Sequence, residues 1–148
     1  MKKIITLSFA LILILSLHAQ AIEGDGLIPI VGTKVSDPAT VKFLKDYDVK
    51  TNGGVKYSSE KTGLDLDTKN GTIISITIYE NSLMYGNFTK KLPKGVKFGT
   101  TTAEVIKTAG KPTTSYISSG YTEYVVGKCV VSYWFEEGKL NQVTISLK

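Results

Sequence analysis

Residues 92–112 constrain the fold of this chain more than any other stretch. Thr101 and Glu104 stand three apart just before an apolar run, which is the pattern of a helix capping box. Gly110 can take the left-handed conformation that ends a helix, and Pro112 prevents its continuation. The pattern therefore predicts a short helix over residues 101–109, entered from an extended segment. Its inward side chains are expected to be Val105, Ile106 and Ala109.

The first half of the chain carries a fainter version of the same signal. Asp37-Pro38 has the composition of an N-cap followed by a first helical residue. We therefore predict a helix of about 10 residues there. Residues 22–31 precede it, are rich in Gly and Pro, and are expected to be extended. The inward face of this helix is expected to be Val41, Leu44 and Tyr47.

Alternation of polar and apolar residues predicts antiparallel strands after each helix. The clearest strand, residues 72–79, follows the type I′ hairpin signal Asn70-Gly71. Its inward side chains are expected to be Ile74, Ile76 and Ile78. Those of the last strand, residues 140–147, are expected to be Val143, Ile145 and Leu147. The other predicted strands are residues 55–59, 64–67, 83–88, 114–117, 121–126 and 129–135.

The two halves of the chain match one another in order. Asp37 falls opposite Thr101 at an offset of 64 residues, and Gly71 falls opposite Gly138 at an offset of 67. We therefore predict an α+β fold of two tandem helix-plus-antiparallel-meander repeats. The alternative is two unrelated stretches with generic patterning. The two repeats are expected at about residues 30–90 and 91–148.

Several residues of the second half resemble a known small unit. Phe98-Gly99 precedes the capping box, and Gly110-Lys111-Pro112 ends the helix. An aromatic strand follows at Tyr124, and Phe-Glu-Glu-Gly-Lys-Leu at residues 135–140 closes the unit. In these features the chain resembles the small outer-membrane assembly lipoproteins of the SmpA/OmlA family and the β-lactamase inhibitor proteins. The first half shares the resemblance only by analogy.

This resemblance to a BLIP-like fold implies helices packed on one face of a curved antiparallel sheet. It also implies that the free, often concave face binds a protein. The chain departs from both families, because no cysteine follows the leader for lipid attachment and Cys129 has no mate for a disulfide. Outer-membrane anchoring and β-lactamase inhibition therefore do not carry over. Cys129 is expected to be a buried structural thiol, the alternative being a reactive one.

Residues 1–21 have the composition of a secretory signal peptide. Lys2 and Lys3 supply the positive start, residues 4–17 are apolar, and Ala19-Gln20-Ala21 is a small-x-small cleavage site. The mature protein is expected to be a single domain, residues 22–148, in the periplasm or outside the cell. No stable membrane insertion is expected after cleavage. The alternative is a membrane anchor, although the apolar run is short for a span of about 20 residues.

Charge and composition argue against nucleic-acid binding and catalysis. All 18 basic residues are lysine, and two lie in the leader, so 16 remain against 13 acidic residues. This small, scattered excess does not form a nucleic-acid footprint. The one histidine, His18, also leaves with the leader, and nucleophilic triads and zinc sites need imidazoles or several thiols. We predict no enzyme activity, metal or cofactor. The remaining catalytic alternatives are a Ser132–Lys128 pair and the carboxylates Glu136 and Glu137.

Aromatic side chains concentrate in the C-terminal strands. Alternation places Tyr133 and Phe135 on the core face and Trp134 on the opposite, polar face. A tryptophan on a polar face with tyrosines across the sheet is typical of a binding anchor. The alternative is a Trp134 covered by the N-terminal segment or by a bulge that changes the register. The predicted binding residues are Trp134, Tyr121, Tyr124, Tyr116 and Tyr79.

These observations predict a non-catalytic, exported protein-binding module. It would be an inhibitor or immunity-type protein that occludes an enzyme or toxin partner. The runner-up is a structural or assembly factor of the envelope, as the lipoprotein resemblance implies, and a small-ligand carrier also stays open. A small basic patch is interpreted as either a solvated face or a contact for an acidic partner. Its residues are Lys90, Lys91, Lys94 and Lys97.

Overall fold

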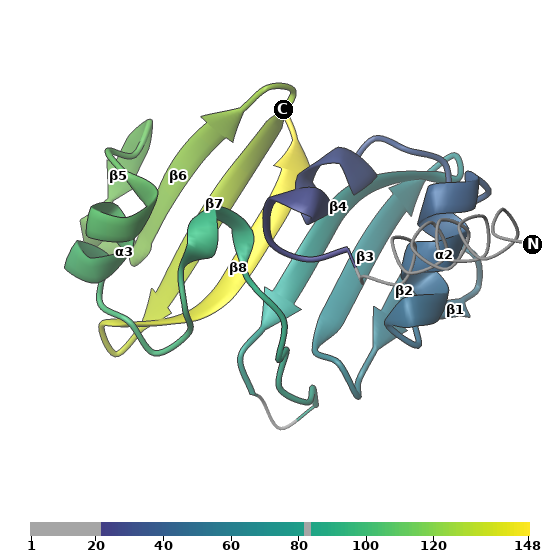
Figure 1. The fold of residues 1–148 in the computed structure, drawn as a ribbon, viewed down its shortest axis with the longest axis horizontal. Helices are drawn as coiled ribbons and strands as arrows, with labels where there is room; N and C mark the ends of the chain where they lie inside the picture. The colour runs from purple at the N-terminus through teal and green to yellow at the C-terminus, as the bar shows by residue number, and fades with distance from the viewer. Residues whose placement is uncertain (1–21, 82–83) are drawn as a thin grey trace, which may run out of the picture.

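The computed structural model describes residues 22–81 and 84–148, and it has an α+β fold built on one eight-stranded antiparallel sheet (Figure 1). The predicted signal peptide lies outside the described residues. The helices are η2 (Gly24–Ile30), α2 (Pro38–Asp46), η3 (Pro93–Gly95), α3 (Thr102–Ala109) and η4 (Ile117–Ser119). The strands are β1 (Lys50–Asn52), β2 (Lys56–Ser59), β3 (Leu64–Lys69), β4 (Thr72–Tyr79), β5 (Thr114–Tyr116), β6 (Tyr121–Val126), β7 (Cys129–Glu136) and β8 (Lys139–Leu147).

The sheet consists of two meanders joined at their last strands. Its strand order is β1-β2-β3-β4-β8-β7-β6-β5, so β4 pairs antiparallel with β8 in the middle. At the centre of that pair Thr77 lies directly opposite Thr144. Most of the predicted strands are present. The exposed edge strand β1 was not predicted, because Lys-Thr-Asn carries no apolar alternation.

The prediction of a strand at residues 83–88 was wrong. In the described part of that segment the chain forms no strand. The Gly86 amide instead donates a hydrogen bond to the Glu60 carbonyl at 2.5 Å. The backbones approach so closely that a Cβ on Gly63 would lie 2.4 Å from the Gly86 carbonyl oxygen. Close packing against the β2–β3 turn therefore replaces strand pairing.

Helix α3 has the predicted ends. The Thr101 hydroxyl accepts a hydrogen bond from the Glu104 amide at 3.4 Å, and the Glu104 carboxylate accepts one from the Thr101 amide at 2.7 Å. This reciprocal pair satisfies two amides that have no partner within the helix. Gly110 follows the helix with a φ of 88°, which favours glycine. Val105 is the fully buried side chain of the helix.

Helix α2 begins at Pro38 as predicted, but its inward face differs from the prediction. Val41 is 50% exposed, whereas Thr40 and Phe43 are fully buried and Tyr47 follows them on the same face. The helix is thus rotated by about one residue from the predicted orientation. The Thr40 and Thr33 hydroxyls are hydrogen-bonded at 2.7 Å, which allows a polar side chain to occupy the inward position.

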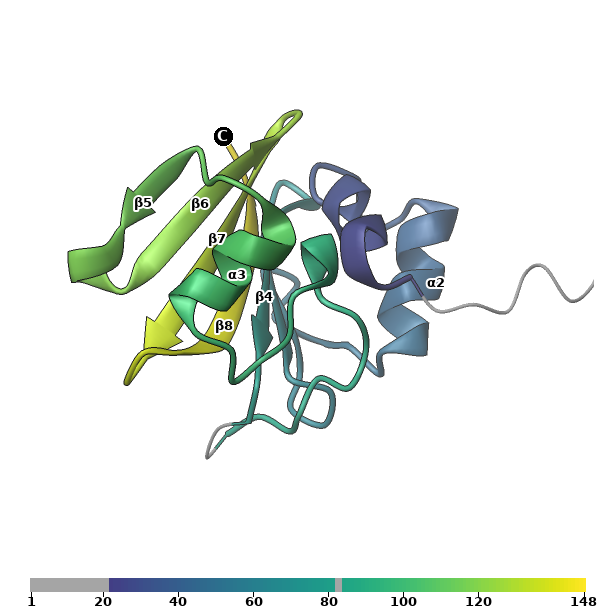
Figure 2. The same ribbon diagram turned by 60° about the vertical axis from the view of Figure 1, so that its left-hand side comes forward.

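The N-terminal segment is not extended as predicted, since residues 24–30 form the 3₁₀-helix η2. Leu27 and Ile30 are both buried, because side chains three residues apart eclipse one another in a 3₁₀-helix. The Gly24 amide donates to the Lys91 carbonyl at 2.7 Å, and the Lys94 amide donates to Asp25 Oδ1 at 2.7 Å. These bonds hold η2 against η3. Figure 2 shows the resulting order α3, η3, η2, α2 across the molecule.

A β-bulge changes the inward set of β4. The β3–β4 register shifts between Asp67 and Thr68, so Ile74 has no direct partner and Ile73 turns inward. Ile73 is fully buried and Ile74 only partly so, which corrects the predicted position. The β7–β8 register shifts at the corresponding place, between Trp134 and Phe135. The inward side chains of β8, Val143 and Ile145, agree with the prediction.

Both halves tie the loop before the helix to the last strand of the meander in the same way. Gly32 donates its amide to Ile73 at 2.7 Å, and the Ile73 amide donates to Thr33 at 2.9 Å. In the second half Gly99 donates to Leu140 at 2.8 Å, and the Leu140 amide donates to Thr100 at 2.8 Å. The hairpins before β4 and β8 also match, because both turn residues have positive φ. Those residues are Asn70, Gly71, Glu137 and Gly138.

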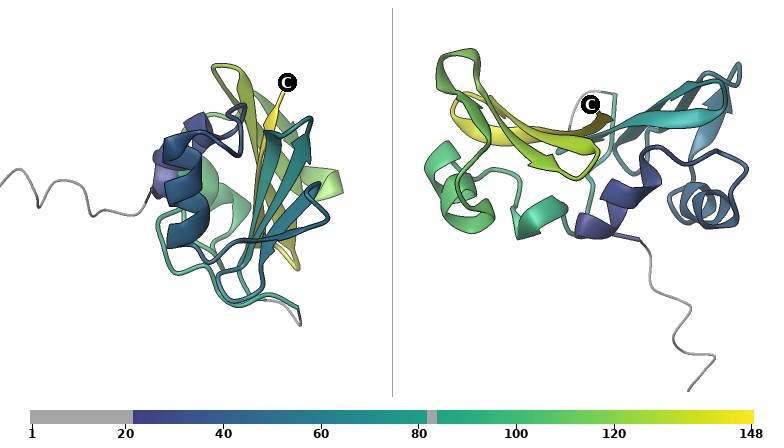
Figure 3. Two further views of the ribbon diagram at one scale, coloured as in Figure 1. Left: turned by 90° about the vertical axis from the view of Figure 1, so that its right-hand side faces the viewer. Right: turned by 90° about the horizontal axis from the view of Figure 1, so that it is seen from above.

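The two faces of the sheet differ in burial. Leu66, Ile76, Val143 and Tyr133 point into one fully buried apolar layer. Figure 3 shows η2, α2 and α3 on one side of the sheet. We call the opposite side the open face, and define it by the outward side chains Trp134, Thr144, Thr77 and Lys56.

Candidate functional site

A row of aromatic side chains crosses the open face. Tyr116 pairs directly with Tyr121, and Tyr121 pairs with Trp134. Trp134 pairs with Gln142, which pairs with Tyr79. Directly paired residues share a face of the sheet, so these side chains form one line from β5 to β4. At about 4.8 Å between neighbouring strands, the line is about 19 Å long. We call Tyr116, Tyr121, Trp134 and Tyr79 the aromatic row.

The rings of the second half contact one another, tilted between Tyr116 and Tyr121 and stacked between Tyr121 and Trp134. The Tyr116 and Tyr121 centroids lie 4.8 Å apart, and the Tyr121 and Trp134 centroids lie 4.4 Å apart at an interplanar angle of 26°. Tyr116 is 44% exposed and Trp134 is 37% exposed. The alternative of a Trp134 covered by the N-terminal segment is therefore excluded, since η2 bonds to η3 instead. These contacts hold three large rings in place at the surface.

A close backbone contact between β6 and β7 explains why the Tyr121 and Trp134 rings meet. The Phe135 amide donates to the Gly120 carbonyl at 2.7 Å, and a Cβ on Gly120 would lie 3.0 Å from the Phe135 carbonyl oxygen. With a φ of 74°, glycine suits this position. The contact places the start of β6 beside the end of β7, which brings Tyr121 opposite Trp134.

Tyr124 lies on the other face, away from the aromatic row. It is 3% exposed and contacts Tyr133 edge to face at 5.4 Å between centroids. Its hydroxyl donates to the Gly110 carbonyl at 2.9 Å, and burial raises the pKa of Tyr124. Tyr124 therefore holds the end of α3 to β6. Its odd spacing from Tyr121 was the sequence signal that could have separated the two tyrosines.

Tyr79 stands at the other end of the row and contacts a residue that sequence reasoning missed. The Tyr79 and Tyr85 rings stack at 4.6 Å between centroids. The Tyr85 hydroxyl donates to Asp65 Oδ2 at 2.8 Å, and Lys56 Nζ lies 3.1 Å from the same oxygen. Burial, first, and then the hydrogen bond to Asp65 raise the pKa of Tyr85. Tyr85, from the described residues 84–88 that form no strand, thus contributes to the open face.

Polar side chains fill the next row of the open face. Ser132 pairs with Glu123 on one side and with Thr144 on the other. The Ser132 hydroxyl donates to Glu123 Oε1 at 3.4 Å. Thr144 pairs with Thr77, and Thr77 pairs with Asp65. The Asp65 Oδ1 atom is buried and has no hydrogen-bond partner among the described residues. The aromatic row therefore borders a band of hydroxyls and carboxylates.

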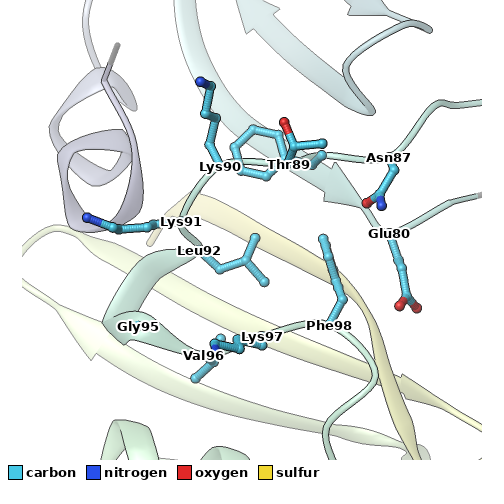
Figure 4. Close-up of a pocket in the computed structure, with 11 residues that line it drawn as sticks. Glu80, Asn87, Thr89, Lys90, Lys91, Leu92, Gly95, Val96, Lys97 and Phe98 are labelled. Atoms are coloured by element: carbon cyan, nitrogen blue, oxygen red, sulfur yellow. The ribbon is translucent and has the colours of Figure 1, made fainter. Parts of the chain in front are cut away.

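The basic patch lies on the other side of the sheet, where three of its residues, Lys90, Lys91 and Lys97, line a cavity of about 670 Å³ (Figure 4). Leu92 and Phe98 extend toward the cavity in Figure 4, whereas Lys90 and Lys91 extend outward. Lys91 Nζ lies 3.4 Å from Glu23 Oε1, so part of the patch charge is compensated within the chain. The basic patch and the aromatic row are therefore separate surfaces.

The contacts of the remaining candidate residues indicate structural roles. Cys129 is 1% exposed, and its thiol donates to the Ile28 carbonyl at 3.8 Å, in agreement with a buried structural thiol. Ser132 is hydrogen-bonded to Glu123, as described above. Across residues 22–81 and 84–148, no three His, Cys, Asp or Glu side chains gather closely enough to hold a metal ion. The described part of the chain also contains no helix of the length and apolarity needed to cross a membrane.

Comparisons of the chain with protein-family models, with curated proteins and with solved structures found no match.

Proposed function

We propose that this chain is a non-catalytic, exported protein-binding module of the inhibitor or immunity type. It acts by occlusion, because the open face covers a functional surface of an enzyme or toxin. The aromatic row is the observation that carries the proposal. Three rings in contact on a polar sheet face combine exposed area with low conformational freedom, and tyrosine and tryptophan are enriched in binding hot spots.

The proposal includes two tandem units whose helices pack on one face of a curved sheet, as in the BLIP-like and SmpA/OmlA-like proteins that the second half resembles. Three matches between the halves support this part. The bulge register of β3–β4 repeats in β7–β8, the Gly32 and Gly99 loops make the same bonds, and both final hairpins have positive φ. Figure 3 agrees, because the sheet bends away from the helices toward both ends.

The two units contribute different chemistry to the open face. In the first unit, Asp67 occupies the position equivalent to Trp134, and Lys56 occupies the position equivalent to Tyr121. One end of the face is therefore aromatic and the other is charged, although the backbone is nearly repeated. Such a surface suits a single asymmetric partner better than a symmetric one.

The test starts with affinity capture by the tagged protein from periplasmic extract and culture supernatant, followed by binding measurements on the recovered partner. Trp134→Ala is expected to cost about 2 kcal/mol of binding or more, which is about 30-fold in Kd. The free energy of unfolding should fall by only about 1 kcal/mol, because the side chain loses one ring stack at the surface. Calorimetric titration and urea unfolding measure the two effects.

Val41→Ala is the matched control, because Val41 is also an exposed apolar side chain but lies on α2. It should leave binding unchanged. A Trp134→Ala protein that keeps full affinity would disprove the proposed binding surface. Recovery of outer-membrane assembly proteins in a sedimenting complex would favour the assembly-factor alternative instead.

A further inference from the structure

The connection between β4 and α3 forms a cavity by itself. All 11 residues that line the cavity of about 670 Å³ belong to residues 80–98. The connection runs from β4 to η3 over residues 80–92, and its described part, residues 80–81 and 84–92, contains no helix or strand. Loops longer than about 12 residues without secondary structure are uncommon in compact domains, and binding loops are a frequent reason for them.

Backbone hydrogen bonds hold both ends of this connection in place. The Glu80 amide donates to the Asn141 carbonyl of β8 at 3.0 Å. At the other end, the Lys91 carbonyl accepts a hydrogen bond from the Gly24 amide of η2 at 2.7 Å. The cavity is thus formed by the fold and does not need a ligand to assemble it. A preformed site lowers the cost of ordering that binding would otherwise carry.

The floor of the cavity is apolar. Phe88, Leu92 and Val96 belong to the buried core, and Phe98 packs against that core while staying partly exposed. Figure 4 shows Leu92 and Phe98 extending toward the cavity. A concave, mostly apolar lining with a few polar groups is typical of small-molecule sites. The floor therefore suits the apolar body of a ligand.

The two ends of the cavity differ in charge. Figure 4 shows Lys90 and Lys91 at one end and Glu80 at the other. With Lys97, the lining holds three lysines against this one carboxylate. Glu23, outside the lining, compensates Lys91, whose Nζ lies 3.4 Å from Glu23 Oε1. Lys90 and Lys97 form no ion pair in the described part of the chain, so both ammonium groups keep their charge for a ligand.

We infer that this cavity binds a free apolar monocarboxylate, whose body lies between Leu92 and Phe98 and whose carboxylate is within reach of the flexible Lys90 and Lys97 side chains. Ammonium groups bind a carboxylate through charge-assisted hydrogen bonds. Glu80 at the opposite end repels a second carboxylate, so a dicarboxylate of the same length is disfavoured. The cavity and the aromatic row lie on opposite sides of the sheet, so this binding is separate from the proposed occlusion of a protein partner.

Calorimetric titration with three probes of equal chain length tests the inference. The full chain is expressed with its leader, and the purified protein is titrated with decanoate, decanol and the dicarboxylate sebacate. Decanoate should bind about tenfold more tightly than decanol or sebacate, and added salt should weaken the decanoate complex. Absence of decanoate binding, or equal affinity for decanoate and either other probe, would overturn the inference.

Two double variants test the role of the lysines. Lys90→Gln with Lys97→Gln should weaken decanoate binding about tenfold and leave decanol binding unchanged. The matched control, Lys45→Gln with Lys111→Gln, removes the same charge from exposed lysines outside the cavity and should bind decanoate like the wild type. If both double variants bind decanoate equally well, the carboxylate is not held by Lys90 and Lys97 and the inference fails.

Two single variants locate the apolar body of the ligand. Phe98→Ala should weaken decanoate and decanol binding alike, because both ligands lose the same apolar contact. Circular dichroism checks that this variant is folded, and a folded Phe98→Ala protein with full affinity would overturn the inference. Trp134→Ala, on the open face, should bind decanoate normally even if it no longer binds a protein partner. Loss of decanoate binding in Trp134→Ala would place the ligand on the open face and contradict the inference.

Discussion

At the scale of single residues, orientation on a strand separates binding side chains from structural ones. Tyr121 and Tyr124 belong to one strand and have the same chemistry. Tyr121 lies in the aromatic row, whereas Tyr124 is buried and bonded to the end of α3. Their difference follows from strand geometry, because residues at an odd spacing point to opposite faces.

Tyr124→Phe should therefore lower stability and leave partner binding unchanged. The variant leaves the Gly110 carbonyl without its donor, which costs about 1 kcal/mol of unfolding free energy. Urea unfolding followed by circular dichroism measures this loss. Tyr121→Phe is the control and should unfold like the wild type. A Tyr124→Phe protein with native stability and weakened binding would instead indicate that Tyr124 contacts the partner.

At the scale of secondary-structure elements, a glycine turn precedes the last strand of each meander. Gly71 and Gly138 occupy the same position in the hairpins before β4 and β8, with φ values of 71° and 77°. Neither has an atom within 4 Å of an added Cβ. Gly63, also at positive φ, is different, because an added Cβ would lie 2.4 Å from the Gly86 carbonyl oxygen.

Gly71→Ala and Gly138→Ala should each destabilise the protein by about 1 to 2 kcal/mol, the cost of left-handed backbone in a residue with a Cβ. Gly63→Ala should cost clearly more, because a backbone clash adds to the same conformational cost. Chemical denaturation of the three variants compares them directly. Unequal effects at Gly71 and Gly138 would contradict the equivalence of the two hairpins.

At the scale of the whole molecule, the layer opposite the open face buries several tyrosines. Burial, followed by the nearby carboxylates of Glu23 and Asp46, raises the pKa of Tyr47 to about 12. Burial also raises the pKa of Tyr133, whose hydroxyl donates to the Pro93 carbonyl at 3.0 Å. The folded protein therefore holds these protons more tightly than the unfolded chain does.

Alkaline pH should consequently destabilise the fold. The contribution of Tyr47 is complete below its ordinary pKa of 10.0 and is lost as the pH rises from 10.0 to about 12, since the unfolded chain releases its proton first. Urea midpoints measured across this range should fall steadily. Tyr47→Phe should reduce the slope of that fall, although it lowers stability at neutral pH. If the urea midpoint of Tyr47→Phe falls with pH as steeply as that of the wild type, Tyr47 is not a source of the alkaline destabilisation.

Much of the local structure could be read from the sequence. The capping box of α3, the Asn70-Gly71 turn and the alternation that turns Trp134 outward depend on neighbours within a few residues. Backbone sterics and side-chain periodicity determine such features, and both are local. Alternation also predicted that Tyr121 and Trp134 point outward, whereas the contact between their rings depends on the pairing of β6 with β7.

Tertiary structure decided the strand order, the path of residues 84–88 and which side chains of α2 and β4 are buried. The strand order brings Tyr79 into line with Trp134. The close approach of Gly63 and Gly86 keeps residues 84–88 out of the sheet. The bulge at Thr68 and the rotation of α2 selected Ile73 and Thr40 as buried residues. Each of these outcomes depends on contacts between residues far apart in the chain. The energy of such contacts depends on packing and pairing partners, and a local sequence pattern does not specify them.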